Sequence, residues 1–236
     1  MKSREAGLAK ETTFVLVHGA WWGGDWFWRG VADRLRAEGH RVFTPMLTGL
    51  GSRAHLKDCG VDLSLHILDI VKLIEWEALT DIVLVGHSYA GMVVSGAAEK
   101  LPEGTIRSIV FLDAFLPENG EALADIASNF KDLAGDHDPV PPPVFFAGDN
   151  EALKAILEKR GSPQSRACFE EPVVLTGARE RIAIKTYVLA QGPVFLPFYE
   201  KAKADPGWRT ETIDCAHFPM LEAPEETAEI LLRAME

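Results

Sequence analysis

The most informative stretch of the chain is residues 82–91, Ile-Val-Leu-Val-Gly-His-Ser-Tyr-Ala-Gly. Residues 82–85 predict a short strand buried on both faces, because such strands read as continuous apolar runs. The small residues that follow predict a helix. Between them, Gly86, Ser88 and Ala90 fit the strand–turn–helix pattern that exposes a nucleophilic serine at a sharp turn, with small residues two positions before and after it. Ser88 is therefore the candidate nucleophile. An ordinary glycine-rich loop that happens to hold a serine is the less favoured alternative.

Similar apolar runs recur along the chain and alternate with helical patterns. Strands are predicted at residues 14–17, 42–43, 109–112, 187–189 and 210–213. Helices are predicted at residues 25–39, 67–74 and 198–204, in the run of small residues that follows Gly91, and after Pro224. Strands that alternate with helices predict an α/β fold, with a mostly parallel sheet flanked by helices on both faces. We expect one domain over residues 1–236.

The alternation stops between residues 117 and 181. This segment contains a proline-rich run at 139–143, the pair Phe145 and Phe146, and a helical pattern at 152–159. Because the segment is short and the alternation resumes after it, we predict a small inserted lid over about 117–181 rather than a second domain.

The loop after the first strand, residues 18–24, reads His-Gly-Ala-Trp-Trp-Gly-Gly. Acyl transfer requires two backbone N–H groups directed at the developing oxyanion. One is expected from Tyr89, the residue after the nucleophile, and the other from Ala20. We expect His18 to hold this loop by hydrogen bonds rather than to act as the catalytic base.

The general base should lie late in the chain, because the order in this type of site is serine, acid, histidine. His217 follows the last predicted strand and fits that position. The acid is less evident, since the loop at 190–195 contains no carboxylate. Asp113 follows four apolar residues, where a buried carboxylate needs a partner such as a histidine N–H. Two alternatives stay open: Asp113 caps the exit of the chain into the lid, or Ser88 and His217 act as a dyad without a strong acid.

Composition narrows the range of partners. Acidic residues outnumber basic ones by eleven among 236 residues, which argues against nucleic acid or an anionic membrane as a partner. Residues 1–12 hold no apolar run suited to a signal peptide, and no stretch has the roughly 20 apolar residues of a spanning helix. Three scattered cysteines favour neither disulfides nor a metal site. We predict a cytoplasmic protein with no cofactor and no metal; the oligomeric state stays open, a homodimer included.

These residues resemble the plant methylesterase and hydroxynitrile lyase group of the α/β-hydrolase superfamily, together with its bacterial esterase relatives. The matching stretches are residues 14–28, 48–51, 85–93, 111–117 and 217–224. The resemblance implies the α/β-hydrolase fold, and it covers nearly the whole chain.

The resemblance also separates two chemistries. The lyases of this group have a threonine after the first-strand histidine and a lysine after the catalytic histidine, whereas this chain has Gly19 and Phe218. The resemblance therefore implies an esterase. One departure concerns the acid, which in the group stands near Gln191 and Gly192. Asp113 instead matches the acid position of some haloalkane dehalogenases, another branch of the fold.

The expected function is a serine hydrolase that cleaves a small to medium, largely apolar or aromatic carboxylic ester through an acyl-enzyme on Ser88. The expected pocket wall is aromatic: Trp22, Phe115, Phe145, Phe146 and Phe218, beside Tyr89. Two other classes remain as alternatives. One is a catalytically inactive ligand-binding protein on the same fold, and the other is a cofactor-free lyase or oxygenase in which the histidine acts without serine attack.

Overall fold

A computed structural model describes residues 11–128 and 130–236 of the chain. The prediction that no targeting segment is present concerned residues 1–12, most of which lie outside this described part.

Six parallel strands form one sheet in the order β2-β1-β3-β4-β5-β6. The strands are β1 (Thr13–Val17), β2 (Arg41–Phe43), β3 (Ile82–Ser88), β4 (Ile106–Ala114), β5 (Ile184–Leu189) and β6 (Arg209–Thr212). The predicted α/β class and parallel sheet are confirmed. The central strands are the apolar runs of the sequence, and all seven residues of β3 are buried.

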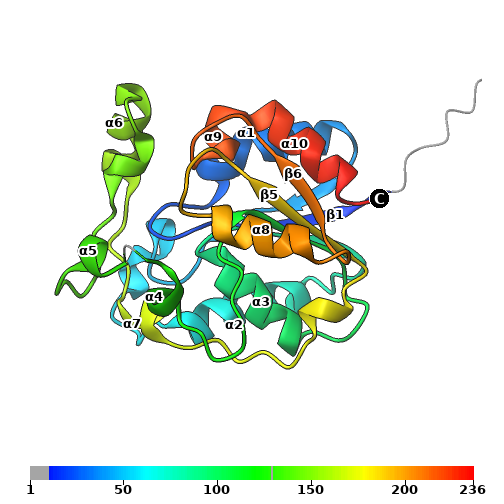
Figure 1. Cartoon of the computed structure of the whole chain (residues 1–236), viewed down its shortest axis with the longest axis horizontal. Coiled ribbons are helices and arrows are strands. Elements are labelled where there is room, and N and C mark those ends of the chain that lie inside the picture. Colours follow the sequence, from blue (N-terminus) through cyan, green and yellow to red (C-terminus); the bar gives the residue numbers. More distant parts are fainter. Residues whose placement is uncertain (1–10, 129) are drawn as a thin grey trace, which may run out of the picture.

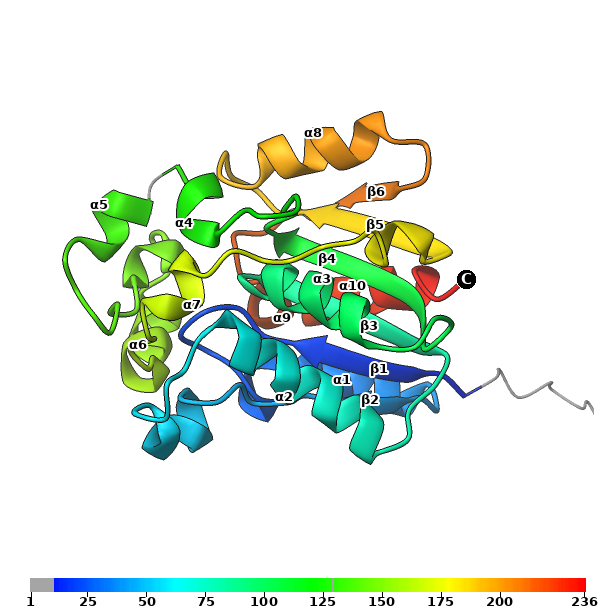
Figure 2. The same ribbon diagram turned by 90° about the horizontal axis from the view of Figure 1, so that it is seen from below.

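Helices cover both faces of this sheet (Figures 1 and 2). On one face lie α1 (Asp25–Ala37), α9 (Pro219–Glu222) and α10 (Pro224–Arg233), and on the other lie α2 (Leu63–Trp76) and α3 (Ala90–Lys100). Helix α8 (Leu196–Ala204) lies beside β5 and β6, and the 3-10 helix η1 (Gly51–Leu56) precedes α2. The four-residue helix α9 is an element that the sequence patterns did not predict.

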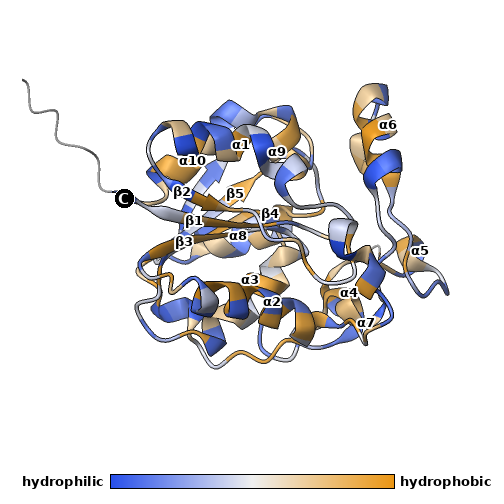
Figure 3. Cartoon of the chain, turned by 180° about the vertical axis from the view of Figure 1, so that it is seen from behind, coloured by the Kyte–Doolittle hydropathy of each residue, from blue (hydrophilic) through white to orange (hydrophobic). Residues whose placement is uncertain are grey.

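The core lies between the sheet and the helices. Figure 3 shows the strands as an apolar centre, with helices that are apolar on one side and polar on the other. Helix α1 buries Trp28, Val31 and Leu35, and α2 buries Ile67 and Ile70, as their helical spacing predicts. Within the described residues, no helix combines the length and apolar character needed to cross a membrane.

The long connection between β4 and β5 carries short helices only. They are α4 (Leu123–Ile126), α5 (Phe130–Ala134), η2 (Val144–Ala147), α6 (Glu151–Arg160), α7 (Ala167–Glu170) and η3 (Arg179–Arg181). Helices α4 to α7 gather at the carboxyl-terminal end of the sheet, and α6 stands out from the rest (Figures 1 and 2). This connection corresponds to the inserted segment at 117–181; its action as a lid, and the single-domain organisation, stay predictions.

Candidate active site

Ser88 is the last residue of β3 and stands at a sharp turn into α3. Its φ angle is +55°, in the left-handed region that costs a non-glycine residue about 1–3 kcal/mol. The turn is tight enough that a Cβ on Gly86 would come within 2.9 Å of the Ala90 carbonyl oxygen. The sequence therefore needs a glycine two positions before the serine, and the serine side chain is displayed at the carboxyl end of the sheet.

His217 and Asp113 approach Ser88 from two other segments. His217 lies between β6 and α9, and its Nε2 is 3.1 Å from the Ser88 Oγ. Its Nδ1 is 2.7 Å from Oδ2 of Asp113, the next-to-last residue of β4. All three residues are buried. Because a carboxylate only accepts, Nδ1 carries the proton and Nε2 is free to accept one from the serine hydroxyl.

Asp113 is held for this contact by backbone geometry. Its φ angle is +44°, and its second carboxylate oxygen accepts a hydrogen bond of 3.0 Å from the Ala190 amide. In the loop after β5, where the sequence resemblance had placed the acid, Gln191 donates its side-chain amide to Asp214. The structure thus brings Asp113, not Asp214, to His217.

The loop after β1 lies directly against the Ser88 turn. A Cβ on Gly19 would come within 2.9 Å of the Ser88 Cβ. Within the described chain, the backbone N–H groups of Ala20 and Tyr89 donate to no protein acceptor. The arrangement therefore leaves two amides beside the serine that can bind an oxyanion.

His18 fixes this loop, as expected. Its Nδ1 donates to the Gly19 carbonyl at 2.7 Å, and its Nε2 accepts from the Leu47 amide at 3.1 Å. Burial lowers the pKa of His18 to about 4. The ring is therefore neutral near pH 7, in the tautomer that these two hydrogen bonds require.

A cavity beside Ser88 is enclosed by apolar side chains from the body of the fold and from the inserted segment. Its lining comprises Ala20, Trp21, Ser88, Tyr89, Phe115, Leu123, Ala127, Phe130, Leu133, Phe146, Phe169, Val194 and Phe195. None of these residues is charged. The cavity, of about 30 Å³, can thus surround a small uncharged apolar group next to the nucleophile.

The lining corrects part of the predicted wall. Phe115, Phe146 and Tyr89 line the cavity as expected, but Trp22, Phe218 and Phe145 do not. Trp22 and Phe218 pack against each other, with ring centroids 5.7 Å apart, and Trp22 donates its indole N–H to the Leu157 carbonyl. Phe145 is 59 % exposed. Side chains of neighbouring residues on a loop or turn point in different directions, so proximity in sequence did not identify the wall.

Sequence reasoning also missed several lining residues. Trp21 could have been found, because it follows Ala20 in the loop already singled out. Phe130, Phe169 and Phe195 come from three segments separated by 26 residues or more, and only the folded chain brings them together.

The Tyr89 hydroxyl and the histidines buried around the site are hydrogen-bonded within the protein. The Tyr89 hydroxyl donates to His66 Nδ1 at 2.9 Å, and His66 Nε2 donates to the Thr48 carbonyl at 2.8 Å. Burial lowers the pKa of His66 and raises that of Tyr89 well above its usual value, so both side chains are neutral. His87 donates to the His217 carbonyl, and its pKa is held well below the ordinary value by burial and then by His217.

Residues 14–230 match the profile of the Alpha/beta hydrolase family. The chain belongs to this family. A carbendazim hydrolyzing esterase from Nocardioides sp. (strain SG-4G) is 40 % identical over 92 % of this hydrolase and 97 % of its own length. Methylesterase 1 of Arabidopsis thaliana is 35 % identical over 50 % of this chain and 44 % of its own. These relatives support ester hydrolysis as the class of activity.

A solved structure agrees with the fold of this hydrolase. It is an extracellular alpha/beta-hydrolase from a Paenibacillus species, described as sharing structural and functional homology with tobacco salicylic acid binding protein 2. It is 27 % identical, covers 94 % of this chain and 98 % of its own, and superposes with a TM-score of 0.77. The resemblance to the methylesterase group that the sequence motifs indicated is confirmed.

Within residues 11–128 and 130–236, no group of three or more His, Cys, Asp and Glu side chains is placed to bind a metal ion.

Proposed function

We propose that this protein is a carboxylic ester hydrolase in which Ser88, His217 and Asp113 form the catalytic triad. The observation that carries the proposal is the continuous hydrogen-bonded chain from Ser88 Oγ through His217 to Asp113, beside an uncharged cavity. A serine activated in this way attacks ester carbonyl carbons.

The proposed reaction has two steps. Ser88 Oγ bonds to the carbonyl carbon while its proton passes to His217 Nε2, and the Ala20 and Tyr89 amides bind the oxyanion. Collapse of the tetrahedral intermediate breaks the ester C–O bond, and His217 returns the proton to the leaving alkoxide. Water, deprotonated by His217, then bonds to the acyl carbon; the bond from that carbon to Ser88 Oγ breaks, His217 returns the proton to Oγ, and the acid is released.

The proposed substrate is a small to medium neutral ester with an apolar or aromatic group. Support comes from the lining, in which the Tyr89 hydroxyl and the Trp21 indole N–H are already hydrogen-bonded inside the protein. An anionic ester would bury its charge without a cationic partner. The similarity to a carbendazim hydrolyzing esterase makes carbendazim, a neutral aromatic methyl carbamate, a natural member of the test panel.

The proposal is tested with a fluorophosphonate, which bonds covalently to activated serines, followed by intact-mass measurement. We expect one adduct on the wild type and none on Ser88→Ala or His217→Ala. In parallel, hydrolysis of a panel of methyl and 4-nitrophenyl esters and of carbendazim should fall by at least about 10³-fold in both variants. An unlabelled wild type, or undiminished hydrolysis by Ser88→Ala, would contradict the proposal; the first result would favour a binding protein and the second a serine-independent lyase or oxygenase.

The cytoplasmic location and the homodimer stay predictions. The Paenibacillus relative is described as extracellular, so the family also includes exported proteins.

A further inference from the structure

The loop that presents the Ala20 amide is held in place by a remote part of the chain. Trp21 has a φ angle of +62°, which is a genuine outlier for so bulky a residue. Such a conformation persists only where surrounding groups determine it. The groups that do so belong to residues 140–164 of the inserted segment, more than a hundred residues away.

Three groups of this segment form hydrogen bonds with Trp21. Its backbone N–H donates to Gln164 Oε1 at 3.0 Å, its carbonyl accepts from the Ser162 amide at 3.0 Å, and its indole N–H donates to the Val140 carbonyl at 3.0 Å. Among these groups, the Gln164 side chain is the one that a point substitution can remove, because the other two partners are backbone atoms.

Two consecutive peptide units in this loop are fixed from opposite sides. His18 Nδ1 donates to the Gly19 carbonyl and so orients the peptide unit whose N–H belongs to Ala20. The next unit consists of the Ala20 carbonyl and the Trp21 N–H. Its carbonyl accepts from the Trp22 amide at 2.7 Å and its N–H donates to Gln164. The direction of the Ala20 amide therefore depends on both side chains.

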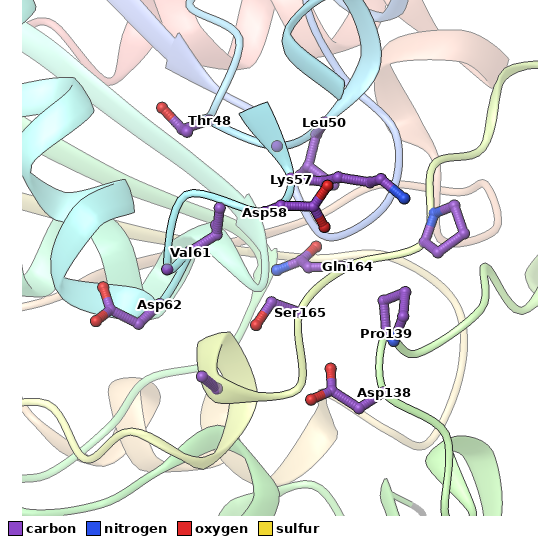
Figure 4. Close-up of a pocket in the computed structure, with 14 residues that line it drawn as sticks. Thr48, Leu50, Lys57, Asp58, Val61, Asp62, Asp138, Pro139, Gln164 and Ser165 are labelled. Atoms are coloured by element: carbon purple, nitrogen blue, oxygen red, sulfur yellow. The ribbon is translucent and has the colours of Figure 1, made fainter. Parts of the chain in front are cut away.

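Gln164 itself is positioned firmly. Its side chain is 1 % exposed, and its backbone forms two hydrogen bonds with Val140, at 2.7 and 3.0 Å, which close the base of the arm formed by residues 141–163. Figure 4 shows Gln164 with Asp138 and Pro139 on one side and the loop that carries Thr48 and Leu50 on the other. Because its backbone is fixed at this pair, the buried Gln164 side chain can hold the Trp21 N–H through Oε1, while its Nε2 donates to no acceptor within the described residues.

We propose that Gln164 is a positioning residue for the oxyanion site: through the Trp21 amide it sets the direction of the Ala20 N–H, so that the inserted segment completes the catalytic machinery as well as covering it. This inference rests on the proposed function. It assigns Gln164 no contact with the substrate, since it acts through the backbone of the loop.

The test compares Gln164→Met with Val140→Ala. Methionine fills a similar volume without an acceptor for the Trp21 N–H, whereas Val140→Ala removes packing from the same neck and keeps every backbone hydrogen bond. For a 4-nitrophenyl ester we expect Gln164→Met to lower kcat by about 10- to 100-fold, somewhat less than deletion of an oxyanion donor, with KM within about twofold. Val140→Ala should keep kcat within about twofold, even if its Tm falls by as much as the Tm of Gln164→Met.

The pH profile separates positioning from general damage. Gln164 forms no hydrogen bond with His217 or Asp113, so the acidic limb of the kcat/KM profile should keep its midpoint in Gln164→Met. Should Gln164→Met be insoluble, Gln164→Asn, which withdraws the oxygen by one methylene, is expected to show the same loss of kcat.

Two results would overturn the inference: wild-type kcat in the Gln164 variants, or an equal loss of kcat in Val140→Ala. Both are distinct from failure of the proposed function, which would appear as a wild type that fluorophosphonate does not label.

Discussion

At the level of single residues, the site concentrates backbone strain. Trp21, Ser88 and Asp113 all have positive φ angles, and each supplies or adjoins a group of the proposed machinery. For Asp113 the unusual backbone lets one carboxylate oxygen accept from the Ala190 amide while the other meets His217. An acid at the end of β4 can therefore reach His217 as well as an acid after β5 could, because the two strands are adjacent.

Replacement of Asp113 by asparagine tests this role. Asparagine Oδ1 can still accept from Ala190, but its NH₂ group would face His217 Nδ1 and favour the tautomer with the proton on Nε2. That tautomer cannot accept the serine proton, so we expect kcat to fall by about 10³- to 10⁴-fold with little change in KM. Steady-state kinetics of Asp113→Asn measures this. Asp214→Asn, which removes an exposed carboxylate three residues before His217, is the control and should retain wild-type kcat; the assignment fails if the two variants exchange these results.

At the level of elements, what could be predicted depended on how local the signal is. The strands β1, β3 and β4 were predicted because a strand that is buried on both faces is an unbroken apolar run in the sequence. Ser88 and Asp113 could be named as candidates because they stand at the carboxyl ends of such strands, and His217 because it follows the last predicted strand. Helix α9 was missed because four residues span little more than one helical turn, which is too short for a repeating apolar pattern to show. Only half of the residues predicted for the cavity wall line it. Whether Phe145 or Phe146 points inward depends on the turn η2 and on the side chains that pack against it, which the sequence does not show.

The pair Phe145 and Phe146 offers a test of that wall. The Phe146 ring centroid lies 4.9 Å from that of His217, whereas Phe145 is mostly exposed and outside the lining. Phe146→Ala should raise KM for aromatic esters by about 2- to 10-fold, the equivalent of losing one aromatic contact, and leave kcat within a few fold. Phe145→Ala is the matched control, with KM unchanged. Initial-rate kinetics with a phenyl and an ethyl ester distinguish the two, and an equal rise for both esters would mean that Phe146 does not contact the aromatic group.

At the level of the whole molecule, the site is built around histidines that are buried and neutral. His18, His66 and His87 each have a pKa below the ordinary value, and in each the largest cause is burial. All three use ring nitrogens as specific donors and acceptors, to Gly19 and Leu47, to Thr48 and Tyr89, and to the His217 carbonyl. The fold thus depends on rings that the unfolded chain would protonate more readily.

This dependence predicts a loss of stability on mild acidification. A group whose pKa is lower in the folded state contributes stability that is fully present above its unfolded pKa of about 6.5 and is lost as pH falls toward the folded value. For His18, with a folded pKa of about 4, that loss approaches roughly 3 kcal/mol between pH 7 and pH 4. Urea unfolding at pH 8, 7, 6 and 5 should show a free energy of unfolding that is level at the upper end and declines below about pH 6.5.

The same measurement on His66→Gln identifies the source of the decline. Glutamine can donate to the Thr48 carbonyl and accept from the Tyr89 hydroxyl as the neutral histidine does, but it takes up no proton when the chain unfolds. Its unfolding free energy should therefore fall less steeply than that of the wild type between pH 6.5 and 5. The difference in slope corresponds to the uptake of up to one proton fewer on unfolding. His55→Gln, at an exposed histidine, is the matched control. A slope in His66→Gln equal to that of the wild type would mean that the acid sensitivity arises from the carboxylates and not from the buried rings around the site.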